Sequence, residues 1–332
     1  SISNKMKRII GLGSPIIDEI AFVDDAFLEN ISGSKGGMEL LAESELESIK
    51  SEINQELVQI TGGSAGNTIF ALARLGIQTS FIGKIGNCAS GDFYKESLAQ
   101  CGGSTQSFKI GNIPNGKCLS LVTPDGQRTM RTSLGAAMTL AEDELNPSDF
   151  QDYDHLHIEG FLILNKDVLH KSLDLAKSNN LTVSFDLASF EIVNQSKSEL
   201  KEILKNHVDM VFANEDEAAA FTQLPPAQSE ESVKILNELC ETAVVKLGAQ
   251  GSLIAKDKTI IHSEAIPVKE VIDTTGAGDF WAAGFLHGWA NNQSIEDSAQ
   301  LGALMGASVI QNHGCALSHR QWDDILKSIQ TT

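Results

Sequence analysis

The chain has 332 residues, which is enough for one large domain, a smaller one beside it and a sizeable buried core. Its formal net charge is −19, from 44 acidic and 25 basic residues, which argues against nucleic acids and anionic membranes as partners because both select basic surfaces. Hydrophobic residues make up 42% of the chain, yet no apolar run approaches the roughly 20 residues of a membrane span, so we expect a soluble globular protein.

The N-terminal part of the chain predicts strands and helices in alternation. Short apolar runs bounded by Gly, Pro or Asp favour strands, and apolar residues at helical spacing favour helices. In chain order these are strands at residues 8–14 and 16–23, helices at 42–57 and 64–75, a strand at 79–85 and a helix at 93–100. Ser44 and Glu47 are spaced as in a capping box, which supports a helix in the segment 42–57.

Residues 108–132 differ from what precedes them, because short strand patterns follow one another there without a helix between them. Two turns divide the strands, one at residues 111–116 and one at Pro124-Asp125-Gly126, which is a strong turn signal. This segment is therefore predicted to be all-β.

After that segment, strand and helix patterns alternate regularly. Strands are predicted at 155–159, 182–186, 210–213 and 243–246, with helices such as 167–178 and 233–240 between them. This alternation predicts a parallel, doubly wound sheet, in which ligands bind beyond the carboxyl ends of the strands. Asp186, Asn214 and Gly248 fall at or just past strand ends, so we expect them on that edge.

Together these patterns predict an α/β fold with a doubly wound, mainly parallel sheet flanked by helices and a small β-sheet lid. We expect the large domain to comprise residues 1–13, 61–104 and 135–332, and two insertions, 14–60 and 105–134, to form the lid. No internal repeat or flexible linker is visible in the sequence.

The segment Asp273-Thr274-Thr275-Gly276-Ala277-Gly278-Asp279 is the strongest functional signal in the chain. A turn of small residues lets the backbone approach a ligand closely, and the amides at the start of the following apolar helix favour an anion. A carboxylate in the first helical turn can accept a proton from a hydroxyl while the amides hold the developing charge. The pattern therefore indicates phosphoryl transfer to an alcohol.

Two other glycine-rich segments resemble known nucleotide motifs and are rejected. Residues 111–118 come close to a Walker A loop, but Cys118 replaces the Ser or Thr that binds Mg²⁺, and a strand pattern follows where a helix is needed. Gly11 and Gly13 open like a dinucleotide fingerprint, but Ile16 occupies the third glycine position and Pro15 obstructs the turn. A hydride-transferring enzyme is therefore not expected.

The segment 273–279 resembles the second signature of the ribokinase-type (PfkB) carbohydrate and nucleoside kinases. Other family motifs are matched in the same order: the opening strand with its acidic residue at 10–18, the first signature at 62–76, the NxxE motif at 214–217 and the KxGxxG element at 246–251. The resemblance covers most of the chain and implies a ribokinase-like fold and an ATP-dependent kinase that phosphorylates an alcohol group.

The resemblance also implies roles for individual residues. Asp279 would be the general base, and the backbone of Gly276, Ala277 and Gly278 would form the anion hole for the phosphoryl group. Arg128 stands where related nucleoside kinases carry an arginine that can turn toward the transferring phosphate, although an exposed hairpin arginine explains it equally well.

For the nucleotide, the resemblance implies ATP with Mg²⁺. Asn214 and Glu217 would order the metal ion and its waters near the phosphates. The nucleotide-binding residues implied are Asn214, Lys246, Gly248, Gly251, Thr275, Ala303 and Ala307, the last two near the purine. A monovalent cation such as K⁺ near Asp273 is a further expectation.

For the acceptor, Asp18, Gly63, Asn67 and Glu159 would bind the substrate hydroxyls. The stretch Lys35-Gly36-Gly37-Met38 resembles bacterial adenosine-kinase-like members, so an adenosine-like nucleoside is favoured, with Met38, Met130 and Phe161 lining an apolar slot for its base. The alternatives are a free sugar or sugar acid (ribose, fructose, ketodeoxygluconate), a pyridoxal- or hydroxymethylpyrimidine-type acceptor, and a catalytically silent binding protein.

Two expectations concern the cell and the assembly. The five cysteines contain no CxxC pair, which suits free thiols in a reducing compartment, so a cytoplasmic location is expected. A small open lid sheet leaves edges and an apolar face to cover, which favours a homodimer through the lid.

Overall fold

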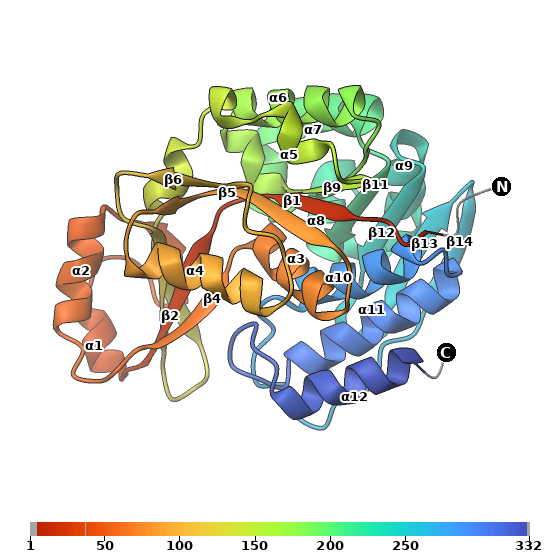
Figure 1. Cartoon of the computed structure of the whole chain (residues 1–332). Coiled ribbons are helices and arrows are strands. Elements are labelled where there is room, and N and C mark those ends of the chain that lie inside the picture. Colours follow the sequence, from red (N-terminus) through yellow and green to blue (C-terminus); the bar gives the residue numbers. More distant parts are fainter. Residues whose placement is uncertain (1–4, 37, 331–332) are drawn as a thin grey trace.

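The computed structural model describes residues 5–36 and 38–330, and within these residues a nine-stranded and a five-stranded sheet are formed (Figure 1). The large sheet has the order β14-β13-β12-β11-β10-β9-β1-β5-β6. Its strands are β1 Ile9–Leu12, β5 Thr79–Gly86, β6 Phe108–Gly111, β9 His155–Glu159, β10 Thr182–Asp186, β11 Met210–Asn214, β12 Thr242–Lys246, β13 Ser252–Lys256 and β14 Thr259–Ser263. All pairs from β12 to β6 are parallel, and β13 and β14 are antiparallel, so the expected mainly parallel sheet is confirmed.

Helices cover both faces of the large sheet because its strands are apolar on both sides. One face is covered by α5 Pro147–Phe150, α6 Lys166–Ser178, α7 Phe190–His207, α8 Glu215–Thr222 and α9 Ser229–Leu239. The other face is covered by α3 Ser64–Arg74, α4 Ala89–Gln100, α10 Ala277–Ala290, α11 Ile295–Val309 and α12 His319–Gln330. Along β11, Val211 packs into the first core and Phe212 into the second, which illustrates the alternation. Short 3₁₀ helices are η1 Gly135–Thr139, η2 Glu142–Glu144, η3 Gly160–Leu164, η4 Pro226–Gln228 and η5 Gly248–Gln250.

The smaller sheet, called the lid below, has the order β3-β8-β7-β2-β4 and lies at one end of the large domain (Figure 1). Its strands are β2 Ile16–Phe22, β3 Met38–Leu40, β4 Val58–Gly62, β7 Gly116–Val122 and β8 Arg128–Ser133. It also contains the helices α1 Asp25–Glu29 and α2 Glu43–Ser51. The N-terminal and central segments of the chain thus come together in one sheet.

The two faces of the lid have different environments. On the outer face, Leu119 and Leu121 pack with Leu28 of α1 and Leu46 of α2 in a small separate core. The chain therefore covers with its own helices the apolar face for which the sequence predicted a second subunit. The inner face carries Asp18 and turns toward the large domain, where Phe22 contacts the ring of His313 edge-on at 5.6 Å between centroids.

Several predicted boundaries need correction. The strand β6 pairs with β5 in the large sheet, so the second lid insertion begins after residue 111 and not at 105. The predicted helix 42–57 ends at Ser51, and the capping box of Ser44 and Glu47 is wrong because Ala42 is the N-cap and offers no side-chain hydrogen bond. No helix among the described residues is long and apolar enough to cross a membrane.

Candidate active site

The turn before α10 has the geometry that an anion site requires. Gly276 is the N-cap of α10 in the left-handed conformation, with φ of 76°, which favours glycine. A side chain at this position would overlap the Sγ of Cys315, so both the conformation and the space exclude it. The amides of Gly278 and Asp279 stand in the first turn of the helix and have no acceptor within it, so they can bind an anion, whereas the Ala277 amide donates to the Thr274 carbonyl at 3.2 Å.

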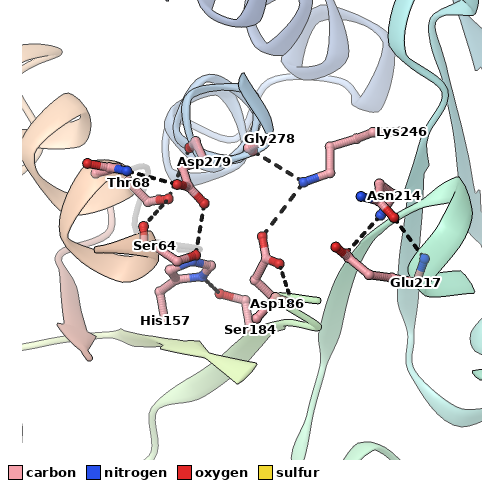
Figure 2. A network of polar contacts seen from close by, with 12 residues as sticks. Ser64, Thr68, His157, Ser184, Asp186, Asn214, Glu217, Lys246, Gly278 and Asp279 are labelled. Carbon is pink, nitrogen blue, oxygen red and sulfur yellow. Dashed lines mark hydrogen bonds and ion pairs between the residues drawn. The ribbon is translucent and has the colours of Figure 1, made fainter. Parts of the chain in front are cut away.

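Asp279 lies in the first turn of α10, and its carboxylate is held from both sides by α3 (Figure 2). Ser64 Oγ donates to Oδ1 at 2.8 Å and Asn67 Nδ2 donates to Oδ2 at 3.0 Å. Burial raises the pKa of Asp279 and the charge of Asp186 adds to this rise, while the hydrogen bonds from Asn67 and Ser64 oppose it. A carboxyl group with its pKa moved toward neutrality is suited to act as a general base.

Two of the residues around Asp279 were not predicted. Besides Ser64, Thr68 Oγ1 donates to the backbone carbonyl of Asp279 at 3.0 Å, which joins α3 to α10 (Figure 2). Both lie in or next to the Gly62–Asn67 motif, so the signal was present, but a Ser and a Thr at the start of a helix are usually ordinary capping residues. Asn67, which was predicted to bind the acceptor, also donates to Asp279, a contact that was not predicted.

The N-cap of α3 is Gly63, whose φ of 88° again favours glycine. A side chain there would overlap the carbonyl oxygen of Ser14, at the entrance to the lid strand β2. Gly63 thus lets the start of α3 lie against the crossing into the lid, which brings Asp18 and Asp279 to the same region.

Asp18 projects from the inner face of the lid and is partly exposed. Among the described residues, no hydrogen bond or ion pair engages its carboxylate. Burial is the main cause that raises the pKa of Asp18 to about 7; Arg128 opposes this rise, and the charges of Asp273 and Asp279 contribute to it. This carboxylate is therefore available to a ligand, and its role in acceptor binding stays a prediction.

We expect Asp18→Asn to raise the KM for the acceptor by about tenfold or more, because a ligand hydroxyl loses a charged hydrogen-bond acceptor, while the KM for ATP stays the same. Since the carboxyl is protonated below its raised pKa, the acceptor KM of the unmodified protein should also rise as pH falls below about 7. Steady-state kinetics between pH 5.5 and 8.5 measure both effects. An acceptor KM in the variant that equals the wild-type value would leave Asp18 without a binding role.

Glu159 does not lie where the sequence predicted. Its side chain is only 2% exposed, and Oε1 accepts hydrogen bonds from the amides of Ser14 at 3.1 Å and Ala65 at 3.3 Å. Burial raises the pKa of Glu159 to about 8. The assignment of Glu159 to direct substrate binding is therefore corrected: it holds the start of the lid strand against the start of α3.

Asn214 and Glu217 form a reciprocal capping box at the start of α8 (Figure 2). Asn214 Oδ1 accepts from the Glu217 amide at 2.8 Å, and Glu217 Oε1 accepts from the Asn214 amide at 3.1 Å. Glu217 is buried, and burial followed by the charge of Asp186 raises its pKa. One oxygen of this carboxylate is not used by the cap and lies in a region with excess negative charge.

Lys246 ends β12 and points toward the start of α10 (Figure 2). Its Nζ lies 3.3 Å from the carbonyl oxygen of Gly278 and 3.7 Å from Oδ2 of Asp186. Lys246 thus lies close to the predicted anion hole. Asp186 ends β10 at the same edge of the sheet, and the sequence placed it there without giving it a function.

Asp273 and Arg128 join the large domain to the lid. Asp273 is buried, and Arg128 Nη2 lies 2.5 Å from its Oδ2. Thr275 donates to Oδ1 through its amide at 3.0 Å and its hydroxyl at 2.7 Å, and the Gly314 amide donates to Oδ2 at 2.6 Å. Burial would raise the pKa of Asp273, but these hydrogen bonds and the Arg128 charge outweigh it and lower the pKa.

The other predicted nucleotide residues lie around this edge with different surroundings. Gly248, with φ of 60°, has open space around its Cα, so a ligand can approach it. A side chain at Gly251 would overlap the Ser263 carbonyl, which gives this glycine a role in the β13–β14 hairpin. Ala303 is buried and Ala307 is partly exposed on α11, which packs against α10. Gly37 of the predicted Lys35–Met38 motif lies outside the described residues.

The site fits Mg²⁺ with few protein ligands. Asp186, Glu217 and Asp279 interact closely enough for Asp186 to raise the pKa of the other two carboxyls, and Lys246 provides the nearby positive charge. No group of three His, Cys, Asp or Glu side chains in the described part of the chain is arranged to hold a metal ion directly. Mg²⁺ commonly keeps several waters and binds proteins through one or two carboxylates, so the free oxygen of Glu217 suits it.

Comparisons with known proteins agree with this geometry. The chain is 26% identical to adenosine kinase 2 of Arabidopsis thaliana over 95% of its length and 97% of that protein. It is 26% identical to 5-dehydro-2-deoxygluconokinase of Geobacillus thermodenitrificans over 81% of its length and 84% of that protein. Its structure resembles adenosine kinase from Sinorhizobium meliloti with a TM-score of 0.87 and 28% identity, covering 98% of this chain and 99% of that one.

A family model described as pfkB family carbohydrate kinase matches residues 38–322. This range includes Asn67, the Asn214–Glu217 cap, Lys246 and the whole of the segment 273–279. Because this family model matches most of the chain, the chain belongs to the pfkB family of carbohydrate kinases and is a kinase.

Proposed function

We propose that the protein transfers the terminal phosphoryl group of ATP to a hydroxymethyl group of a nucleoside, with adenosine as the favoured acceptor. The observation that carries the proposal is the position of Asp279, held by Ser64 and Asn67 beside the anion turn, with the unpaired carboxylate of Asp18 across from it on the lid. A base, an anion site and a hydroxyl-binding group in one place satisfy the requirements of this reaction.

Each residue has a distinct part in the proposed mechanism. Asp18 binds and orients the acceptor, and Asp279 takes the proton of the hydroxyl. The hydroxyl oxygen attacks the terminal phosphorus of ATP as the bond to the β-phosphate oxygen breaks, and ADP leaves. The amides from Gly276 to Asp279 stabilise the negative charge on the phosphoryl group during transfer. Mg²⁺, when bound near Glu217, would neutralise charge on the nucleotide phosphates. Arg128 is proposed to leave Asp273 for the phosphoryl group when substrates bind.

The inner face of the lid favours a nucleoside over a free sugar. Asp18 is aligned across the sheet with Cys118, Thr132 and Leu40, and Ile20 with Ser120, Met130 and Met38, so these side chains share one face. Met38 is 52% exposed and Leu40 is 59% exposed, which is unusual for large apolar side chains unless a ligand covers them. Phe161, at the carboxyl end of β9, is 39% exposed and completes the set proposed to contact a base.

The acceptor can be identified by following ADP release with ATP, Mg²⁺ and a panel of adenosine, inosine, ribose, fructose, fructose 6-phosphate and ketodeoxygluconate. A kcat/KM for adenosine at least about tenfold above that for any sugar supports the proposal, because an apolar slot for the base adds roughly 1–3 kcal/mol that a sugar lacks. A preference for ketodeoxygluconate or ribose would reject the nucleoside and favour the sugar-kinase alternative, which the similarity to 5-dehydro-2-deoxygluconokinase supports.

Replacement of Glu217 by Gln is expected to raise the Mg²⁺ concentration required for half-maximal activity several-fold. Gln keeps the capping acceptor for the Asn214 amide, so the fold should be unaffected, but it removes the negative charge that attracts the ion. Activity titrated with MgCl₂ measures the effect. Asp216→Asn, on the exposed side of the same helical turn, is the matched control. If the wild type and both variants require the same Mg²⁺ concentration, Glu217 serves only as a helix-capping residue.

The remaining parts of the proposal concern other ligands, location and assembly. We infer purine contacts near Ala303 and Ala307 from the family resemblance. A K⁺ ion near Asp273 has less support, because Arg128, Thr275 and Gly314 already occupy both carboxylate oxygens. The five cysteines are free thiols, which supports a cytoplasmic location. A homodimer through the lid loses its main argument, because α1 and α2 cover the outer face.

A further inference from the structure

The ammonium group of Lys246 is confined at the edge of the anion turn. Its side chain is 12% exposed and Nζ donates to the Gly278 carbonyl at 3.3 Å (Figure 2). That carbonyl belongs to the first turn of α10, so the positive charge adds to the partial positive charge of the helix start. A phosphate bound to these amides would therefore meet the ammonium group as well.

Gly278 leaves the space that this ammonium group occupies. A Cβ at residue 278 would lie 2.7 Å from Lys246 Nζ, which is closer than real contacts allow. The atom in the way is the end of a flexible side chain, so an alanine could be accommodated if Lys246 moved. The glycine at 278 thus leaves room for the Lys246 ammonium group. This adds to the function that the sequence suggested, which is to let a phosphate approach the backbone.

Asp186 is the charged partner that faces Lys246. Its side chain is 7% exposed, and its Oδ2 is 3.7 Å from Lys246 Nζ, while Oδ1 accepts from the Ala188 amide at 3.0 Å. Ala188 has φ of 70°, a conformation that is unfavourable for a residue other than glycine. The turn fixes Oδ1 of Asp186 through this hydrogen bond, and Oδ2 then faces Lys246.

The placement of Asp186 carries a cost that needs an explanation. Its negative charge lies near Asp279 and Glu217, where it makes ionisation of both less favourable. A neutral residue in place of Asp186 would remove this unfavourable charge, because a buried carboxylate lowers stability unless it is paired with a cation. Lys246 is the cation among the described residues whose position explains why the carboxylate is there.

We propose that Asp186 is a positioning residue, which holds the charged Lys246 beside Gly278 so that its ammonium group binds the phosphates of the nucleotide. The inference rests on the proposed kinase reaction and assigns Asp186 a part in it. Asp186 acts through Lys246 and does not touch the nucleotide.

The test measures nucleotide binding by calorimetry, independently of any acceptor, with Mg²⁺ and a non-hydrolysable ATP analogue. Lys246→Met should weaken binding about 100-fold and Asp186→Asn about tenfold, and the double variant should be no weaker than Lys246→Met alone. Asp186→Glu should recover part of the loss. Glu144→Gln is the matched control, because it breaks a different ion pair, the one between Lys84 and Glu144, whose charged atoms are 2.8 Å apart. This variant should bind the ATP analogue as the wild type does.

Gly278→Ala gives a second, independent readout. It should weaken binding in the wild-type background by displacing the ammonium group, and it should add little to Lys246→Met, where no ammonium group remains. The KM for ATP should follow these affinities in assays, while the acceptor KM stays unchanged.

Two results would overturn the proposal. One is a tenfold effect of Asp186→Asn that persists in the Lys246→Met background, because Asp186 would then act without the lysine. The other is an Asp186→Asn variant that only raises the Mg²⁺ requirement, because Asp186 would then serve the metal ion. If the wild type binds the ATP analogue but phosphorylates none of the acceptors, the proposed acceptor fails while the roles of Asp186 and Lys246 are still decided by binding.

Discussion

Asp279→Asn is expected to lower kcat about a thousandfold or more while nucleotide affinity changes little, because the amide cannot accept the proton of the acceptor hydroxyl. The substitution preserves size and leaves an oxygen for the hydrogen bond from Ser64 or Asn67. Loss of activity would therefore reflect lost chemistry and not an altered fold. Single-turnover kinetics with ATP and adenosine, together with calorimetric nucleotide binding, measure both parts.

The matched control is Asp297→Asn, since Asp297 occupies the first turn of α11 as Asp279 occupies the first turn of α10. Both carboxylates interact with a helix dipole, but Asp297 is exposed and belongs to none of the site motifs. The control should retain full turnover. If the kcat of the Asp279→Asn enzyme were within about tenfold of the wild-type kcat, Asp279 would not be the general base, since a general base contributes more than that.

The pH dependence follows from the same carboxylate. A base works only when ionised, so its raised pKa moves the acid limb of the kcat profile upward from the range of an ordinary Asp toward neutrality. Activity should fall as pH decreases through that raised value. Ser64→Ala removes a hydrogen bond that stabilises the ionised form, so it should move the acid limb further toward high pH.

The sequence was sufficient for the architecture because its signals were long and regular. The strands from His155 to Lys246 are apolar runs separated by helices, and this pattern admits few folds other than a parallel sheet. It was insufficient for β6, because short strands in the large sheet and in the lid look alike and pairing depends on distant residues. The same limit explains α2, whose start is set by packing of Leu46 and not by a capping side chain.

The site was predictable where motifs fix the backbone and less so where tertiary contacts decide. Asp279 and Gly276 lie in the first turn and at the N-cap of α10, because a short motif at a helix start fixes the local backbone. Glu159 was misplaced because a carboxylate at a strand end can face the ligand or the amides beneath it, and only the fold shows that Ser14 and Ala65 take it. Asp186 was placed on the correct edge, but its partner Lys246 is 60 residues away, and no local pattern joins the two.

Gly276→Ala is expected to lower turnover by about 10² to 10³-fold, because it would misdirect amides that hold the transferring phosphoryl group. Two effects act together. The φ of 76° disfavours a residue with a side chain by about 1 kcal/mol, and the new methyl group would overlap Cys315 Sγ, so the turn must move. Turnover and unfolding by denaturant should be measured on the same preparations.

Gly76→Ala separates these effects, because Gly76 has φ of 90° but nothing within 4 Å of the position of an added Cβ. It should lose about 1 kcal/mol of stability and keep its activity, whereas Gly276→Ala loses more activity than its stability explains. Adding Cys315→Ala to Gly276→Ala should restore part of the turnover by removing the overlap, although the unfavourable φ remains. If Gly276→Ala retained near-normal turnover with the stability loss of Gly76→Ala, the turn could not be the anion hole, and the phosphoryl group would have to be held by Lys246 and Arg128 instead.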